Sequence, residues 1–588
     1  MSSAIQDDRQ PAQPQGESTS NADWVEKDIR YVVHPVTPAD GERVVLKDGH
    51  GCTLVAEDGR EFLDAHAGAW LVQVGHGRRE IADAVHRQLS DFAHFSLRFG
   101  ISNKPVIALS ERLVALAPDN IAKVRYCTSG SEADDEALQI ARYYHAASGH
   151  PERTVIITLR GAYHGRTVAG GALAAHLPLG MEDQFPGMVV QVAAPTPYRN
   201  DCPPDEDLTD YCIRDLERTI AQVGPERIAA MFGEPALGPA GMIPLPADYW
   251  PRVQEVLHRN GILLVMDEVV TGIGRTGQWL ASSALGLRPD VILLAKGLAS
   301  GYMPIGAILL SGDVAAVVDP LPSGGSYGGH AASCAAAVAN LDIIEREGLL
   351  ENARARGAQF LAELQPLLEL PVVGDVHGVG LMLGIDLVAD KATKQPLDGI
   401  DLPLTQAIRD ESGVLLNVSH GTIVIMPPLV ITAEEVTRVV QAIRLAVERL
   451  DPDGTLHPPA PTSQPRKENP MHEEIVAAVT AYVEGVRTAD PTRVKDAFRA
   501  DGTMWGYLGD QFVTMSAGEF AEQVVATSPA PDDSYSYEIH SVSATGDVAS
   551  AVLDEKAYLG ANFRNYFGLV RSEGTWRIAS KVFTTVGA

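Results

Sequence analysis

The chain has 588 residues, 45% of them hydrophobic and 21% charged, and a formal net charge of -29 at pH 7. This length exceeds what a single hydrophobic core supports, so we expect several packing units in a soluble globular protein. The excess of negative charge repels polyanions, which argues against nucleic acid and against an anionic membrane surface as partners.

The five cysteines are scattered and include no C-x-x-C pair, a spacing that favours neither a disulfide framework nor a metal site. The N-terminal segment is polar and rich in Gln, Pro and Ser, unlike a signal peptide. No apolar run approaches the ~18–20 residues of a membrane span. We therefore expect a cytoplasmic protein with no membrane segment.

Residues 1–23 lack apolar periodicity and are predicted to be disordered. From residue 24 to about 450, short all-apolar runs alternate with longer amphipathic segments. Such runs are typical of strands buried on both faces of a mainly parallel sheet, and the segments between them are typical of crossover helices. The runs expected as strands are 124–127, 154–158, 228–232, 262–266, 291–295 and 307–310.

Helices are expected at 132–146 and 247–259, and the Ala-rich stretch 331–344 predicts a buried helix. Helical spacing around 357–368 and 433–450 indicates a smaller α+β unit after the sheet. The first 450 residues therefore predict an α/β fold with a smaller α+β part.

Residues 451–470 are dense in proline and nearly free of apolar side chains, which predicts a semi-extended linker. After it the pattern changes to a separate α+β module over residues 471–588. Helices are expected there at 473–487 and 491–499, and antiparallel strands at 535–542, 548–558, 562–570 and 575–583.

Residues that can carry chemistry follow several of the expected strands, where open parallel sheets bind ligands. The segment 128–132 (TSGSE) ends a strand and opens a helix, so that its backbone N–H groups and the Ser131 hydroxyl can bind an anion. Helix capping alone would also produce this sequence. Tyr163, beside His164 and Gly165, could stack on a planar ring or occupy an ordinary turn.

Asp267 and Lys296 end two further strands. An apolar strand that delivers an acid into a pocket either costs stability or serves a cation, and the protonated pyridine ring of pyridoxal phosphate is such a cation. A structural ion pair is the alternative for Asp267. A lysine desolvated at a strand end favours the neutral amine that forms imines.

In combination, these motifs resemble the class III aminotransferases of pyridoxal-phosphate fold type I. The resemblance covers about residues 24–450 and depends on 129–132 (SGSE), 163–165 (YHG), 234–235 (EP), 267–277 (DEVVTGIGRTG), 295–297 (AKG) and 427–429 (PPL). It implies a large domain with a mainly parallel sheet over about residues 80–345. It also implies a small α+β domain built from the N-terminal segment and residues 346–450.

The resemblance implies pyridoxal 5'-phosphate as cofactor and a role for each matching residue. Lys296 would be the Schiff-base partner and proton carrier, and Asp267 would pair with the pyridine nitrogen. Tyr163 would stack on the ring, and Val269 would pack on its other face. The remaining residues implied at the cofactor are Ser129, Gly130 and Ser131 around the phosphate, with His164 and Glu234 beside the ring.

Relatives of this kind are obligate dimers with shared active sites, which implies a homodimer or higher homo-oligomer. Ser326 stands where relatives usually have a phosphate-binding Thr that reaches across the dimer interface. Val270 is typical of types that act on an ω-amine or ω-amino acid, and Trp70 resembles their pocket-lining Trp. The implied partners are therefore an amino donor and a 2-oxo acid acceptor.

The sequence departs from the family where substrate carboxylates are bound. Asn417 and Val424 occupy the two positions at which relatives carry a carboxylate-binding Arg. Class III relatives also include racemases, decarboxylases, aminomutases and phospho-lyases, which share the cofactor site. Transamination is the expected reaction, and these reactions are the alternative.

Residues 471–588 resemble the NTF2-like, SnoaL-type α+β cone, a group with lumazine-binding members. The resemblance depends on 482–485 (YVEG), 497–498 (AF), 565–567 (NYF) and 576–583 (WRIASKVF). A dimerisation unit, a small-molecule binding cup that passes substrate to the first domain and a second enzyme are all open for this module.

Overall fold

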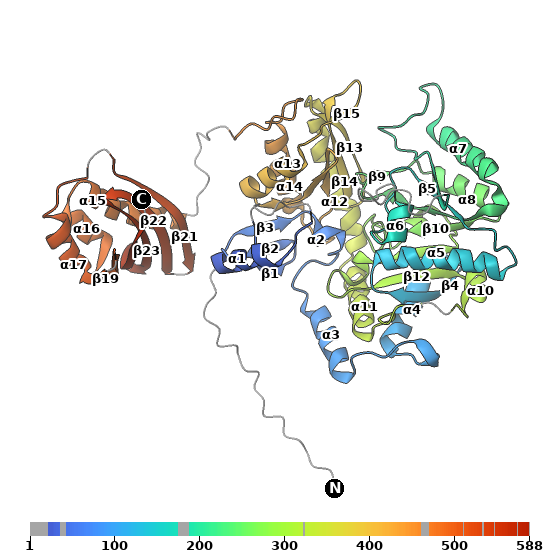
Figure 1. The fold of residues 1–588 in the computed structure, drawn as a ribbon, viewed down its shortest axis with the longest axis horizontal. Coiled ribbons are helices and arrows are strands. Elements are labelled where there is room, and N and C mark those ends of the chain that lie inside the picture. Colours follow the sequence, from blue (N-terminus) through green and yellow to red (C-terminus); the bar gives the residue numbers. More distant parts are fainter. Residues whose placement is uncertain are drawn as a thin grey trace, which may run out of the picture. The chain divides into compact units, whose positions relative to one another are not determined.

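The computed structural model describes residues 21–35, 43–174, 187–321, 324–459, 470–509, 511–531, 534–545, 547–572 and 574–586. The chain divides into two compact units, Met1–Pro458 and Pro459–Ala588 (Figure 1). Most of the segment expected to be disordered lies outside the described residues, but residues 21–23 open helix α1 (Asn21–Tyr31). Asp23 in its first turn favours a helix start there, because an acidic side chain complements the helix dipole.

A seven-stranded sheet forms the centre of the first unit, in the order β4-β12-β11-β10-β7-β5-β6. Its strands are β4 (Ile121–Cys127), β5 (Val155–Leu159), β6 (Val189–Val192), β7 (Ile228–Gly233), β10 (Leu263–Asp267), β11 (Val291–Leu294) and β12 (Gly306–Ser311). β12 is antiparallel to β11 and β4, and the other neighbours are parallel. The six predicted strands are confirmed. The edge strand β6 was not predicted, because its exposed Gln191 interrupts the apolar run.

Alternate side chains of the sheet pack against helices on opposite faces. On β10, Leu264 and Met266 belong to a cluster with residues of α7 and α8, whereas Val265 belongs to a cluster with residues of α5 and α10. These helices are α5 (Gly130–Ala147), α7 (Leu208–Val223), α8 (Tyr249–Arg259) and α10 (Gly312–Val318). Burial on both faces explains why the strands are apolar throughout.

The rest of the first unit combines the N-terminal segment with the segment after the sheet. Strand β16 pairs in parallel with β3, which joins the two segments in the four-stranded sheet β1-β2-β3-β16. A second sheet contains the antiparallel strands β13-β14-β18-β17. The bounds are β1 (Leu46–His50), β2 (Thr53–Ala56), β3 (Glu61–Asp64), β13 (Val373–Val379), β14 (Met382–Asp390), β16 (Val414–Leu415), β17 (Asn417–Ser419) and β18 (Thr422–Ile425).

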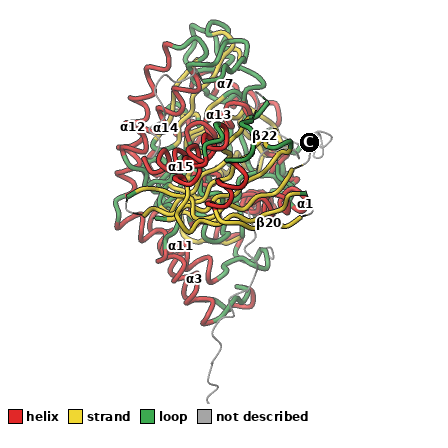
Figure 2. The backbone as a smooth tube through the Cα atoms, turned by 90° about the vertical axis from the view of Figure 1, so that its left-hand side faces the viewer, coloured by secondary structure: helices red, strands yellow, loops and turns green. Residues whose placement is uncertain are grey.

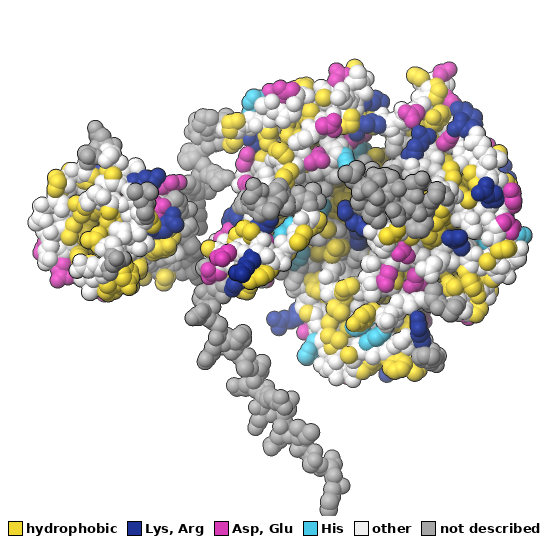
Figure 3. Space-filling model, viewed as in Figure 1, with side chains coloured by type: hydrophobic (Ala, Val, Ile, Leu, Met, Phe, Trp, Pro, Cys, Tyr) yellow, Lys and Arg dark blue, Asp and Glu magenta, His cyan; other side chains and the backbone are white. Residues whose placement is uncertain are grey.

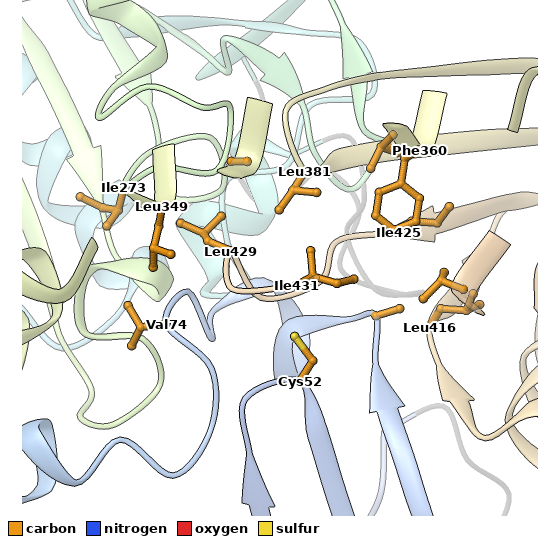
Figure 4. Close-up of a cluster of buried hydrophobic side chains, with 14 of the residues drawn as sticks. Cys52, Val74, Ile273, Leu349, Phe360, Leu381, Leu416, Ile425, Leu429 and Ile431 are labelled. Atoms are coloured by element: carbon orange, nitrogen blue, oxygen red, sulfur yellow. The ribbon is translucent and has the colours of Figure 1, made fainter. Parts of the chain in front are cut away.

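One large apolar core holds these parts together. In Figure 4, Cys52 of the N-terminal segment lies near Ile431, and Leu429 lies between Leu349 and Leu381. Helix α11 packs beside α3, and α12 packs beside α14, in both Figure 1 and Figure 2. The bounds are α3 (Arg79–Asp91), α11 (Ala331–Arg346), α12 (Leu349–Leu364) and α14 (Ala433–Val447). The buried helix predicted at 331–344 is confirmed as α11.

The second unit is a six-stranded sheet packed against helices, in the order β20-β19-β24-β23-β22-β21. Its elements are α15 (Pro470–Arg487), α16 (Pro491–Ala497), β19 (Phe498–Leu508), β20 (Gln511–Ser516), α17 (Ala517–Phe520), a π-helix (Ala521–Val525), β21 (Ser536–Thr545), β22 (Val548–Tyr558), β23 (Ala561–Ser572) and β24 (Thr575–Val586). The four predicted strands are confirmed. β19 and β20 were not predicted, and β19 begins at Phe498, inside the helix expected at 491–499.

The structure corrects the linker prediction for its first residues. The backbone N–H of His457 donates to the carbonyl of Arg449 (3.0 Å), and the Arg449 guanidinium donates to the carbonyl of His457 (2.7 Å). Residues 451–458 therefore fold back on the end of α14, a pairing between residues that proline content does not reveal. Residues 460–469 lie outside the described residues.

On the face shown in Figure 3, Lys and Arg side chains lie among Asp and Glu side chains rather than in one basic field. Among the described residues, no helix combines the length and apolar character that a membrane span requires.

Candidate active site

A cavity of about 410 Å³ lies at the edge of the central sheet where β4, β10 and β11 end. These strands point in the same direction, because β12 is antiparallel to both β4 and β11, so residues that follow them meet at one place. The predicted site residues that line the cavity are Ser129, Gly130, Ser131, Tyr163, Asp267, Val269 and Lys296. The other four predicted residues, His164, Glu234, Trp70 and Ser326, do not line it.

The N-terminus of α5 faces one side of the cavity. Ser129 is its N-cap and accepts a hydrogen bond from the backbone N–H of Glu132 (3.3 Å). The Ser131 hydroxyl accepts one from the backbone N–H of Arg166 (3.0 Å), which fixes this loop beside the segment after β5. A side chain at Gly165 would place its Cβ 2.6 Å from Ser131 Oγ, so the close approach requires glycine.

Asp267 is the last residue of β10, and each of its two carboxylate oxygens has a hydrogen-bond partner. Oδ1 accepts a hydrogen bond from the backbone N–H of Val269 (3.0 Å), and Oδ2 lies 2.9 Å from His164 Nδ1. His164 is 0% exposed, and Nδ1 also lies 3.7 Å from Asp134 of α5. Burial, followed by repulsion from Asp267 and Glu234, raises the pKa of Asp134 well above its ordinary value. These contacts fix the orientation of the Asp267 carboxylate.

Glu234 supports the site from the end of β7. Its carboxylate accepts hydrogen bonds from the backbone N–H groups of Tyr163 (3.1 Å) and Gly238 (2.9 Å). Burial raises the pKa of Glu234 to about 7, although His164 opposes this shift. Glu234 thus positions the segment that carries Tyr163.

Lys296 follows β11 in a strained turn, with φ of 39° at Lys296 and 51° at Ser300. Asn340 of α11 holds this turn, because its Nδ2 donates to the carbonyls of Gly297 (2.9 Å) and Leu298 (3.0 Å). Burial lowers the pKa of the Lys296 ammonium, and nearby carboxylates, Asp267 foremost, oppose the shift. The turn therefore holds an amine that loses its proton more readily than a solvated lysine.

The Trp70 ring faces this lysine, with its centroid 5.1 Å from Lys296 Nζ. Trp70 ends a turn, α2 (Ala67–Trp70), in which all four residues have positive φ. Such strain at non-glycine residues is typical of functional sites. Trp70 also packs against an apolar cluster whose members are Ala236, Met242, Val270, Met382, Val424 and Met426.

In the part of the chain that the structure describes, two groups of side chains have the composition of metal ligands, and we assign neither to a metal ion. His164 Nδ1 is already used by Asp267 in the first group. In the second group, which contains His377 and Asp386, Arg199 donates to Asp386 (3.1 Å) and His377 Nε2 donates to the carbonyl of Gly241 (2.8 Å). A guanidinium beside the carboxylate competes with a cation there.

The sequence of the first unit matches the model of a known protein family. The model described as Aminotransferase class-III matches residues 37–447. The chain belongs to the class III aminotransferases. The sequence is 34% identical over 455 residues to the diaminobutyrate–2-oxoglutarate transaminase of Halomonas elongata, which covers 74% of this chain and 97% of the relative. It is 34% identical over 422 residues to the putrescine–pyruvate aminotransferase of Pseudomonas aeruginosa, covering 70% and 91%.

A solved structure has the same fold. An amine transaminase from an uncultivated Pseudomonas species, in its PLP-bound form, has a TM-score of 0.68 and 40% sequence identity, covering 71% of this chain and 98% of that chain. This aminotransferase is therefore a pyridoxal-phosphate enzyme of the fold type that the motifs predicted. The family described as "Putative lumazine-binding" matches residues 470–584, which adds an NTF2-like domain.

The aminotransferase's own residues fit pyridoxal phosphate. The α5 N-terminus offers backbone N–H groups and hydroxyls suited to a phosphate, and Asp267 offers a carboxylate suited to a protonated pyridine nitrogen. A side chain at Gly130 would place its Cβ 2.9 Å from Val269, so glycine allows the start of α5 to pack closely against Val269. Tyr163 and Val269 both line the cavity between these ends.

Asp134 and several cavity residues were not predicted from the sequence. Asp134 lies on the buried face of α5, where an acid breaks the apolar pattern, and that break is the signal that could have identified it. Cavity-lining residues that carry no sequence signal are Leu71, Met303, Pro304 and Ile305.

Proposed function

We propose that this aminotransferase moves an amino group from an amine or ω-amino acid to a 2-oxo acid, with Lys296 as the residue that holds the cofactor and carries the proton. The position of Lys296 carries the proposal, because it lines the same cavity as Asp267 and its Nζ lies 5.1 Å from the centroid of the Trp70 ring. When bound, pyridoxal phosphate supplies a carbonyl group that accepts the amino group and a ring that stores the electron pair.

The residues around Lys296 would bind the cofactor and orient it. Gly130 and Ser131 would bind the phosphate, and Asp267 would hold the proton on the pyridine nitrogen. Tyr163 and Val269 would hold the ring between them. Lys296 Nζ, neutral more often than a solvated lysine, would accept a proton from the donor carbon and return it.

The apolar cluster beside Trp70, which contains the cavity-lining Val270, supports a preference for donors with an uncharged, apolar substituent. Val424 is 1% exposed and packs with Val270 in the apolar cluster next to Trp70. Asn417, the other position of the family's carboxylate-binding Arg, pairs with Val424 across β17 and β18. Neither position offers a cation to a carboxylate on the donor.

A homodimer is part of this proposal. Ser326 is exposed, and its carbonyl accepts a hydrogen bond from His94 Nε2 (2.8 Å). Large aromatic side chains near it are also exposed: Phe92 at 43%, Phe95 at 53% and Tyr327 at 61%. A partner subunit would cover this aromatic surface and bring Ser326 to its phosphate site. The cytoplasmic location expected from the sequence stays a prediction.

A donor screen tests the function. The cofactor-loaded protein is mixed with single amines or ω-amino acids and with pyruvate or 2-oxoglutarate, and the alanine or glutamate formed is measured. We expect an apolar primary amine to give product, and Lys296→Ala to abolish it, while Lys495→Ala in the second unit leaves it unchanged. Failure of every donor with both acceptors would refute amino transfer. A monomeric mass by light scattering would refute the dimer.

A further inference from the structure

Polar side chains are buried inside the apolar core of the second unit. Lys581 of β24 and Glu555 of β22 are 4% and 1% exposed, and Lys581 Nζ lies 3.7 Å from Glu555 Oε2. Lys581 also donates a hydrogen bond to the Tyr482 hydroxyl of α15. Glu555 accepts hydrogen bonds from the Tyr535 hydroxyl (2.8 Å) and from Asn565 Nδ2 (2.8 Å). Five residues that are distant in sequence therefore meet in one buried group.

Aromatic rings surround the Lys581 ammonium. Their centroids lie 4.5–5.9 Å from Nζ, and they belong to Tyr482, Phe520, Phe567 and Phe583. Rings stabilise a cation less well than water does, so burial lowers the pKa of Lys581 to about 8, although Glu555 opposes the shift. About a tenth of such a lysine is the neutral amine at pH 7, several hundred times the share of a solvated lysine.

Two buried polar atoms beside this group have no partner among the described residues. They are the Tyr558 hydroxyl oxygen and Asn565 Oδ1, on strands β22 and β23. An unmet buried donor or acceptor costs free energy, and a bound polar molecule would recover it. Asn565 also donates a hydrogen bond to Glu555 through its Nδ2. The Asn565 Oδ1 atom that has no partner therefore lies next to the Glu555–Lys581 pair.

Stability alone does not account for these residues. Well-packed apolar side chains usually give a core at least as stable as one that contains a buried ion pair. The group also reaches towards the surface, because the half-buried Tyr535 donates directly to Glu555 and the half-buried Phe583 lies over Lys581.

We propose that the interior of the second unit binds a small aldehyde or ketone, with Lys581 Nζ forming a reversible imine with its carbonyl carbon. The lone pair of the neutral Nζ forms the new C–N bond, and the carbonyl oxygen takes up a proton. The C–O bond then breaks and the oxygen leaves as water, which carries away both protons of the amine. Nothing is oxidised or reduced. Tyr482 and Glu555 are placed to move the protons.

The ligand class agrees with what the first unit would release. Amino transfer from a primary amine leaves an aldehyde or a ketone, so a carbonyl-binding module on the same chain would receive that product. This agreement rests on the proposed function, whereas the chemistry of Lys581 does not. The test therefore uses added carbonyl compounds and no amino donor.

Reductive trapping on the full cofactor-loaded chain tests the proposal. The protein is incubated at pH 7 with a low concentration of propanal or benzaldehyde and cyanoborohydride, and the alkylation of each lysine is followed by peptide mass spectrometry. We expect Lys581 to be alkylated at least about tenfold faster than the exposed Lys556 of the same sheet, because burial lowers the pKa of the Lys581 ammonium. Labelling of Lys581 no faster than that of Lys556 overturns the proposal.

Variants separate the imine site from general reactivity. Tyr482→Phe keeps the ring and removes the hydroxyl, and we expect it to slow labelling of Lys581 but not of Lys556. Tyr507→Phe, on exposed β19 surface, should change neither rate. Equal labelling of Lys581 in the wild type and in Tyr482→Phe would overturn the proton-transfer part. The main measurement is made on the unaltered chain, so it does not depend on how a variant folds.

Discussion

His164 Nδ1 lies 2.9 Å from Asp267 Oδ2 at the end of β10, where Asp267 lines the cavity and His164 is buried beside it without lining the cavity. The other oxygen of Asp267 is held by the backbone N–H of Val269. Asp267 therefore needs no reorganisation to meet a cation in the cavity. A preorganised carboxylate of this kind stabilises a positive charge more strongly than a mobile one, because its orientation is fixed before the reaction begins.

The first prediction concerns this contact. His164→Ala removes the group that orients Asp267, and we expect kcat/KM for the best donor to fall on the order of 10²-fold, as a small misplacement of a reacting group can cause. Cofactor affinity, measured by equilibrium dialysis, should weaken as well. His150→Ala, at an exposed histidine of the same unit, should change neither quantity. An unchanged kcat/KM in His164→Ala would show that Asp267 is oriented by other groups.

The second prediction concerns pH and Glu234. Its folded pKa of about 7 lies above the ordinary value of 4.5, so the folded state keeps the proton that the unfolded state releases. This contribution to stability is full below pH 4.5, decreases as pH rises and is lost above pH 7. The change is about 3.5 kcal/mol, at about 1.4 kcal/mol for each of the roughly 2.5 pKa units between the two values.

Urea unfolding of the cofactor-free protein at pH 5, 6, 7 and 8 measures the contribution of Glu234 to the free energy of unfolding. Glu234→Gln cannot titrate, so its free energy of unfolding should change less over this range than that of the wild type. Parallel curves for the two proteins would contradict the assignment. The Glu226→Gln variant, in the short turn before β7, serves as the control and should follow the wild type.

Much of the fold could be predicted because its signals are local. A strand buried on both faces must be apolar, and the six runs from 124–127 to 307–310 are each confirmed as strands within a few residues. The cavity residues Ser129, Asp267 and Lys296 could be located from sequence because each follows such a strand directly.

The features that could not be predicted depend on distant contacts. The turn Ala67–Trp70 holds positive φ at three non-glycine residues, a conformation that no local pattern indicates. Strand β19 pairs in parallel with β24, about 80 residues away, and its Gly and Asp residues resemble a loop. The Lys581 group collects side chains from α15, β22, β23 and β24. These polar side chains become buried only when the four elements pack together, so the sequence alone does not reveal their burial.

The third prediction concerns the turn that holds Lys296. Asn340→Leu leaves the carbonyls of Gly297 and Leu298 without their side-chain donor in a dry interior. We expect a loss of about 1–3 kcal/mol in the free energy of unfolding and a lower kcat, because an unmet buried acceptor is costly and the lysine turn relaxes. Asn260→Leu, where the amide donates to a carbonyl at a helix end, is the matched control and should lose less. Equal losses in both variants would mean that the turn is held by its own backbone.

The fourth prediction concerns Trp70, whose ring lies over Lys296 Nζ. Trp70→Ala removes apolar contact area from a small donor and opens space for a larger one. Pocket contacts of this size are worth about 1–3 kcal/mol in discrimination. The ratio of kcat/KM for a donor with a bulky branched substituent to that for propylamine should therefore rise at least about tenfold. Trp505→Ala in the second unit should leave the ratio unchanged. If the ratio stays constant in Trp70→Ala while kcat falls for both donors, Trp70 acts through Lys296 and not through the substrate.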